Sequence, residues 1–198
     1  MLYFSSGVYL RMQKENGFTL TELLIAMIIM LVLAGIGLPT MIYHYARAKQ
    51  QKAIAQVQRL ETALEQFKSD MGYYPVELTE GEYFGTTSTD TSKRAAIIQA
   101  LSGYDKNQNK VAAWWDDQYW HGPYLEFDKK ELDSSGQFID PWQEAYLFDG
   151  TAAGRDLNNT ASFDILSKGP DRIWNAGTPG HTDNDDNIVN WLPNYVND

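Results

Sequence analysis

The sequence contains no cysteine, which excludes a disulfide framework and a cysteine-based zinc site. It also has few basic residues, because 16 Lys and Arg stand against 26 Asp and Glu and give a net charge of −10. Binding to nucleic acid requires clustered Lys and Arg, so we expect no nucleic-acid partner. The acidic balance is compatible with binding of cations.

Catalytic motifs are missing as well. The three histidines, His44, His121 and His181, occur in no HExxH pattern, and the chain has no phosphate-binding glycine loop and no nucleophile elbow. Pairs of carboxylates occur, but an acidic chain contains such pairs by chance. We therefore expect no enzymatic activity.

Residues 18–38 form the one long apolar run, FTLTELLIAMIIMLVLAGIGL. A helix of this length spans about 30 Å, the thickness of a bilayer core. Arg11 and Lys14 precede the run and the acidic bulk of the chain follows it, so the positive-inside rule places the N-terminus in the cytoplasm. The sequence thus predicts a single-pass membrane protein whose head lies on the side of the membrane away from the cytoplasm.

A cleaved secretory signal peptide is the alternative interpretation, with small residues at 34–37 as its cleavage zone. The apolar part of a signal peptide has about 7–15 residues and no reason to carry a carboxylate. Glu22 lies inside this run, and a charge there costs about 2.5–3.5 kcal/mol, so such a group usually has a partner and a function. These features favour an anchor that is retained.

The stretch KENGFTLTE, which ends at Glu22, resembles the cleavage site of type IV prepilins and type II secretion pseudopilins. The resemblance implies that a prepilin peptidase removes residues 1–17 by cutting after Gly17 and methylates Phe18. It also implies that the Glu22 carboxylate is neutralised by the N-terminal amine of a neighbouring subunit, which sets the axial register of a homopolymer. Translation from Met12 would give a shorter leader, MQKENG.

Pro39 lies 21 residues after Phe18, where it could kink the helix or end it. Helical spacing resumes after it, which favours a kink and a continuous helix over residues 18–71 of about 80 Å. Gly72 follows as a stop signal, and residues 72–198 would form the head. The apolar positions are Ala46, Ala53, Ile54, Val57, Leu60, Leu64, Phe67 and Met71.

Residues 77–118 are the least regular part of the head. Residues 77–92 are polar and predict a loop, whereas residues 94–101 (RAAIIQAL) predict a short helix. The aromatic cluster at 114–120 could bind a glycan or another ligand, but packing in the core or between subunits is the commoner use of such residues.

The motif WHGPYL, which begins at Trp120, and the motif DPW at Asp140 with Tyr146 resemble the GPYL and DPWG-x-x-Y signature of the major pseudopilin of type II secretion. Gln143 stands where that family has glycine, and the spacer 126–139 is longer. The resemblance implies a pilin fold of the α+β class, in which a long N-terminal helix packs on a small antiparallel sheet.

The segments FDILSKGPD at 163–171 and DNDDNIVNW at 183–191 resemble the calcium loop of the same family. Carboxylates and carbonyls suit Ca²⁺, although an acidic run can also be a solvated tail. An EF-hand is excluded, because its glycine and glutamate positions hold Ile188 and Asn194. The predicted ligands are Asp171, Asp183, Asp185, Asp186 and the backbone carbonyl of Lys168.

The resemblance implies a subunit that polymerises with itself into a periplasmic pseudopilus, together with minor pseudopilins and the inner-membrane platform of type II secretion. A major or minor subunit of a type IV pilus, with a role in adhesion, motility or DNA uptake, is the alternative. Many pilins close their C-terminal loop with a cysteine pair, and its absence here favours the pseudopilin.

Overall fold

The computed structural model describes residues 17–75, 88–150, 162–175 and 182–192, without the side chains of residues 36–43 and 88–90. All but the last residue of the predicted leader 1–17 therefore lies outside the described residues. The chain divides into two compact units, Met1–His44 and Tyr45–Asp198.

The helix α1 extends over Leu20–Met71, so the prediction of a continuous helix is confirmed and its start moves from Phe18 to Leu20. The helix does not end at Pro39. It ends before Gly72, which has a φ of +79° and donates its N–H to the Lys68 carbonyl at 2.8 Å. A left-handed residue of this kind is the usual helix stop, as predicted.

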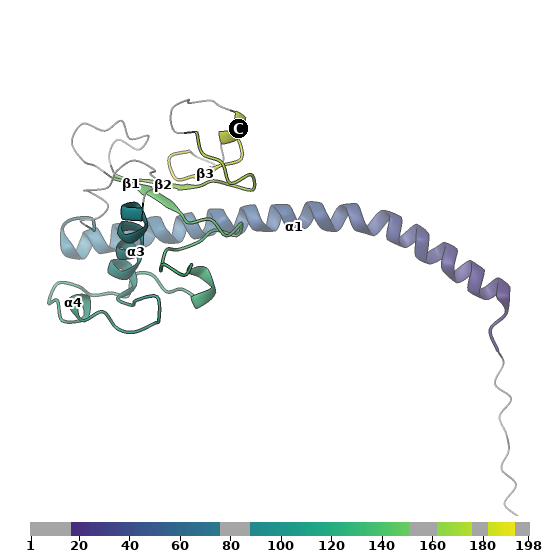
Figure 1. Ribbon diagram of the computed structural model, residues 1–198, viewed down its shortest axis with the longest axis horizontal. Coiled ribbons are helices and arrows are strands. Elements are labelled where there is room, and N and C mark those ends of the chain that lie inside the picture. The colour runs from purple at the N-terminus through teal and green to yellow at the C-terminus, as the bar shows by residue number, and fades with distance from the viewer. Residues whose placement is uncertain (1–16, 76–87, 151–161, 176–181, 193–198) are drawn as a thin grey trace, which may run out of the picture. The chain divides into compact units, whose positions relative to one another are not determined.

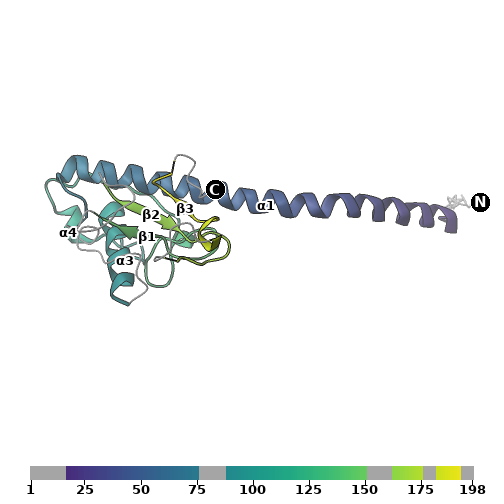
Figure 2. The same ribbon diagram turned by 90° about the horizontal axis from the view of Figure 1, so that it is seen from above.

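Three short strands form an antiparallel sheet in the order β1-β2-β3. They are β1 (Leu147–Asp149), β2 (Asp164–Ser167) and β3 (Ile188–Val189). In both views the sheet lies beside the C-terminal half of α1 (Figures 1 and 2). The predicted α+β fold with a helix packed on a small antiparallel sheet is confirmed.

One face of the sheet packs against α1. Phe148, Ile165 and Ile188 belong to the same buried cluster as the helix stripe, because alternate residues of a strand point to the same face. Six α1 side chains at helical spacing are fully buried there. They are Ala53, Val57, Leu60, Ala63, Leu64 and Phe67.

The opposite face of the sheet is covered by the C-terminal part of the chain. Leu147, Leu166 and Val189 are buried next to Trp174 and Trp191. Since both faces are covered, every residue of the three strands is buried.

The helix α3 covers Ser88–Ser102, so the helix predicted at 94–101 is confirmed and the loop predicted for residues 88–92 is wrong. Ile97, Ile98 and Leu101 are buried in the main core. Their packing stabilises a helix that extends back into a polar segment of weak helix propensity.

The aromatic cluster at 114–120, which begins in the short helix α4 (Ala112–Trp115), packs inside the head, as expected. Trp115 donates its indole N–H to the Gly103 carbonyl at 2.8 Å, and Trp120 donates to that of Ala100 at 2.9 Å. The two indole rings lie 5.2 Å apart. Tyr119 is the exposed exception, at 60%.

The same five-residue turn occurs three times, starting at Asp105, Asp133 and Asp140. In each, the aspartate Oδ1 accepts the N–H groups two and four residues later, and the aspartate N–H donates to the carbonyl four residues on. A β-bridge closes each turn. The fourth position has positive φ and holds Gln108, Gly136 and Gln143, respectively.

Gln143 therefore occupies a left-handed position, with φ of +72°, that glycine adopts at lower cost. Gln143→Gly is expected to raise the unfolding free energy of the head by about 0.5–1 kcal/mol, after allowance for the more flexible unfolded chain. Thermal melting of a fragment covering residues 45–198 measures the change. Gln143→Ala keeps the strained φ and is the control. Equal melting of the two variants would contradict the prediction.

Candidate assembly helix and metal loop

The predicted processing site leads directly into the first turn of α1. Gly17, Phe18 and Thr19 precede the helix. The Thr19 hydroxyl accepts the Glu22 N–H at 3.2 Å, while Glu22 Oε2 accepts the Thr19 N–H and hydroxyl, both at 2.8 Å. These reciprocal bonds form a capping box, which places the Glu22 carboxylate at the helix N-terminus, beside the residues that would become the mature start of the chain.

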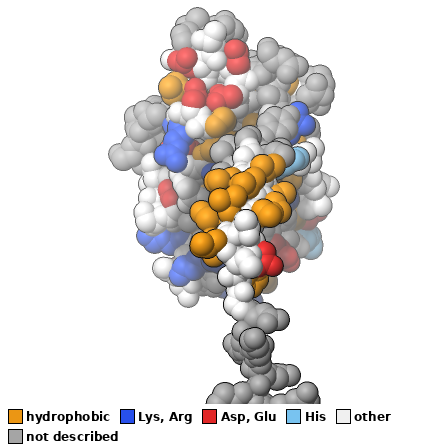
Figure 3. Space-filling view, turned by 90° about the vertical axis from the view of Figure 1, so that its right-hand side faces the viewer, with side chains coloured by type: hydrophobic (Ala, Val, Ile, Leu, Met, Phe, Trp, Pro, Cys, Tyr) orange, Lys and Arg blue, Asp and Glu red, His pale blue; other side chains and the backbone are white. Residues whose placement is uncertain are grey.

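The N-terminal part of α1 exposes its apolar side chains on all sides. The exposed fractions are 52–90% in a series of large side chains from Leu20 to Leu33. Figure 3 shows a group of hydrophobic side chains near the centre of the face that it draws. A continuous apolar surface of this kind requires cover by lipid or by other protein.

Within the described residues, no helix is long and apolar enough to cross a membrane. The predicted span of residues 18–38 continues into residues 36–43, whose side chains are outside the described part of the chain.

The acidic C-terminal segment is a closed loop between two paired strands. Ser167 at the end of β2 pairs with Ile188 at the start of β3, and Leu166 pairs with Val189. Asn190 adds a further link, because its side-chain oxygen accepts the Ile165 N–H at 2.7 Å. Apolar residues thus dock both ends of the loop.

Asp171 and Asp186 meet across this loop. The Asp171 N–H donates to Asp186 Oδ2 at 3.3 Å, and Asp186 Oδ1 is buried with no hydrogen-bond partner among the described residues. Gly169 lies so close that an added Cβ would be 2.3 Å from the Asp186 carbonyl oxygen. Only glycine fits at this contact, which brings backbone and carboxylate oxygens together.

The electrostatics of this pair are unfavourable without a cation. Burial raises the pKa of Asp186, and the negative charges of Asp171 and Asp185 raise it further. A buried carboxylate oxygen that lacks a donor and feels the negative charge of nearby carboxylates is an arrangement that a hard cation stabilises.

The other predicted ligands either have hydrogen-bond partners or are exposed to solvent. Asp183 Oδ2 accepts the Asn175 side-chain amide at 2.9 Å, and Asp185 is exposed. The Asn187 amide, oriented to donate, reaches the Lys168 carbonyl at 3.0 Å. Among the described residues, no group of three or more His, Asp or Glu side chains is placed to hold a metal ion.

Sequence reasoning overlooked the asparagines that shape this loop. Asn184 and Asn187 are buried, and the Asn184 side-chain oxygen accepts the Asn175 N–H at 3.0 Å. The signal was present in the pattern DNDDN, in which asparagine alternates with aspartate and supplies amide donors that carboxylates lack.

The two sequence motifs of the head anchor loops to helices. The N–H groups of Tyr124 and Leu125 both donate to the Leu101 carbonyl at the end of α3, at 2.8 and 3.1 Å. The Tyr146 hydroxyl donates to Gln56 on α1 at 3.1 Å. Tyr146, which directly precedes β1, thus attaches this strand to α1, and Phe148 does so through its core packing.

Comparison with known proteins gives two adjoining family matches. Residues 12–38 match the prokaryotic N-terminal methylation motif, and residues 40–81 match protein G of the type II secretion system. No solved structure matches the chain.

Curated relatives extend the similarity over the head. The type II secretion system core protein G of Escherichia coli K12 is 26% identical over 90% of this chain and 92% of its own length. The Klebsiella pneumoniae protein of the same name is 27% identical over 91% and 96%, respectively. That of Vibrio cholerae is 37% identical over 33% of this chain and 44% of its own length.

The exposed apolar part of α1, the capping box at its start and the sheet packed on its C-terminal half agree with a pilin-like α+β fold. The matched methylation motif, the match to protein G and the relatives that cover about 90% of the chain support a pilin-like protein similar to the major pseudopilin of type II secretion.

Proposed function

We propose that this chain is the structural subunit of a periplasmic pseudopilus that drives protein export by type II secretion. The observation that carries the proposal is the difference in burial between the two parts of α1. Apolar side chains between Leu20 and Leu33 are exposed, whereas those between Ala53 and Phe67 are buried in the head. A helix with one half already packed leaves the other half for lipid before assembly and for neighbouring helices in a filament.

The remaining parts of the proposal follow from this arrangement. The precursor crosses the inner membrane once through residues 18–38, with its N-terminus in the cytoplasm and its head in the periplasm. Prepilin peptidase cuts after Gly17, and the new Phe18 amine meets Glu22 of a neighbouring subunit. Minor pseudopilins and the inner-membrane platform are the further partners.

Calcium is proposed as a structural cofactor of the loop between β2 and β3. Asp171 and Asp186 would supply carboxylate oxygens, with backbone carbonyls and waters completing a shell of about six to eight oxygens. The cation would supply no chemistry beyond neutralising these carboxylates and stiffening the loop.

The proposed function can be tested by deleting the gene for this chain in its own bacterium. Type II substrates are expected to accumulate in the periplasm and to be released again when the intact gene is supplied. A type IV pilus subunit would instead leave secretion unchanged and abolish surface pili, twitching or DNA uptake.

A further inference from the structure

A groove at the N-terminal end of the head carries unpaired positive charge in an otherwise acidic protein. It has a volume of about 320 Å³ and lies between α1 and the loop that precedes β1. Tyr45, Lys49, Lys52 and Gln56 line it from α1, at spacings of three to four residues that place them on one helix face. Lys130 lines it from the loop.

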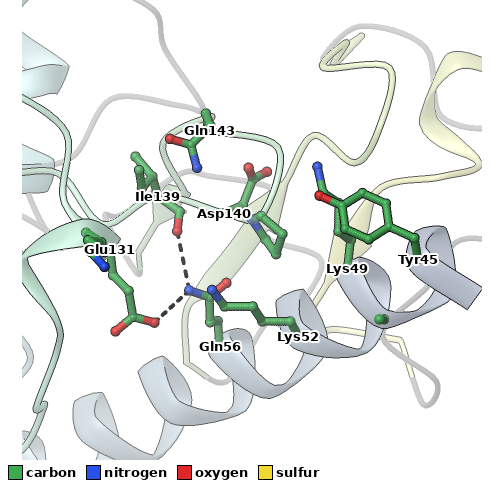
Figure 4. Close-up of a pocket in the computed structure, with 11 residues that line it drawn as sticks. Tyr45, Lys49, Lys52, Gln56, Glu131, Ile139, Asp140 and Gln143 are labelled. Carbon is green, nitrogen blue, oxygen red and sulfur yellow. Dashed lines mark hydrogen bonds between the residues drawn. The ribbon is translucent and has the colours of Figure 1, made fainter. Parts of the chain in front are cut away.

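The groove has a fixed floor. Gln56 donates its side-chain amide to Glu131 Oε1 at 3.0 Å and to the Ile139 carbonyl at 3.4 Å, so α1 and the loop are held together beneath the lysines. Figure 4 shows both bonds, with Lys49 and Lys52 extending from α1.

The two carboxylates that line the groove are already engaged. Glu131 accepts from Arg59 at 3.3 Å, from Gln56 and from the Asp128 N–H. Burial raises its pKa, but these donors outweigh the burial, and the pKa is lowered overall. The Asp140 carboxylate accepts the N–H groups at 142 and 144 and the Ser167 hydroxyl, the last at 2.6 Å.

The lysines have no such partners in the part of the chain that the structure describes. No salt bridge among the described residues involves Lys49, Lys52 or Lys130, and the one recorded contact of these ammonium groups is that of Lys49 with the Tyr45 ring, 5.2 Å from its centre. Three lysines thus line a groove whose own carboxylates accept hydrogen bonds from other groups.

We infer that this groove receives a carboxylate-bearing surface of a second copy of the same chain. The inference rests on the proposed filament, in which identical subunits stand side by side. Since each copy carries a net charge of −10, assembly brings acidic surfaces together, and a cationic groove on each copy offsets their repulsion and fixes their register.

Charge reversal tests this contact in the full-length chain, expressed with its secretion machinery. Lys52→Glu combined with Lys130→Glu is expected to lower filament yield about tenfold or more, because like charges would then face each other. Lys129→Glu changes a neighbouring exposed lysine outside the groove and is expected to leave the yield within about twofold of the unaltered protein. Unchanged melting of the head excludes misfolding as the cause.

Carbodiimide cross-linking identifies the occupant directly. Filaments made from a mixture of ¹⁵N-labelled and unlabelled chains are treated and digested, and the peptides are analysed by mass spectrometry. Mixed-isotope links from Lys49, Lys52 or Lys130 to an Asp or Glu support the inference. Links from these lysines only within one chain or to a different protein overturn it, as does normal polymerisation of the reversed variant. Absence of filaments from the unaltered chain would overturn the proposed function instead.

Discussion

Glu22→Gln is expected to insert into the membrane normally and to lose filament assembly. Glutamine can keep the capping box with Thr19, because its amide oxygen accepts the same two bonds that Glu22 Oε2 accepts. It removes only the negative charge. If that charge neutralises the Phe18 amine of a neighbour, its loss leaves a cation in apolar surroundings at a cost of about 2.5–3.5 kcal/mol, or about 100-fold in association.

Two further variants separate charge from capping. Glu22→Ala removes both and is expected to insert but assemble as poorly as the glutamine variant. Thr19→Ala weakens the cap by about 1 kcal/mol and keeps the charge, so it should retain most assembly. The measurement is the amount of sheared filament relative to membrane-bound precursor. Normal filament yield from either Glu22 variant would contradict the assigned role.

Calcium is expected to raise the melting temperature of the fragment of residues 45–198 by about 5–10 °C, and magnesium to have little effect. Ligand at about 100 times its dissociation constant stabilises a protein by about 2.7 kcal/mol, and each kcal/mol shifts a domain of this size by about 2–4 °C. Equal melting temperatures in 1 mM calcium and in EDTA would contradict the proposed calcium site.

Asp186→Asn sharpens the calcium test, because its effect should change sign. In EDTA the variant loses a half-buried carboxylate that nearby negative charges repel, and it should be as stable as the unaltered head or more stable. In calcium it loses a ligand and should be less stable. Asp171→Ala and Asp186→Ala should likewise abolish the calcium response, while Glu126→Gln, an exposed carboxylate elsewhere, should keep it.

The same carboxyl predicts a pH dependence. Because burial and neighbouring charges raise its folded pKa above the usual 3.8, the folded head holds this proton more tightly than the unfolded chain. Its contribution to the unfolding free energy therefore falls as pH rises from about 4 through the raised folded value. In EDTA, the unaltered head should therefore lose stability relative to Asp186→Asn as the pH rises over this range. A difference in unfolding free energy that does not change with pH would contradict this prediction.

The helix was predictable because its signals are local. The apolar spacing from Ala53 to Phe67 and the stop at Gly72 determine which face is buried and where α1 ends. The strands were not predictable in position, since β3 has only two residues and exists through pairing with β2. The polar sequence of Ser88–Ser92 predicts a loop for a related reason, because its helical state follows from the packing of Ile97 and Leu101.

The candidate sites were likewise predictable only where their signals are local in the sequence. The resemblance around Gly17–Glu22 indicated the processing and assembly residues, and the structure adds the capping box. The acidic pattern indicated the metal loop, but which carboxylates meet depends on the close approach at Gly169. The lysine groove joins α1 to a loop far along the chain, and no spacing rule connects residues so distant in sequence.

The most direct test of the account is the N-terminal mass of the protein in filaments sheared from cells that overproduce it with its secretion machinery. The account predicts a polymer whose subunits begin at a methylated Phe18. Subunits that begin at Met1 or Met12, or near residues 34–37 as after signal-peptide cleavage, with no polymer formed, would contradict it.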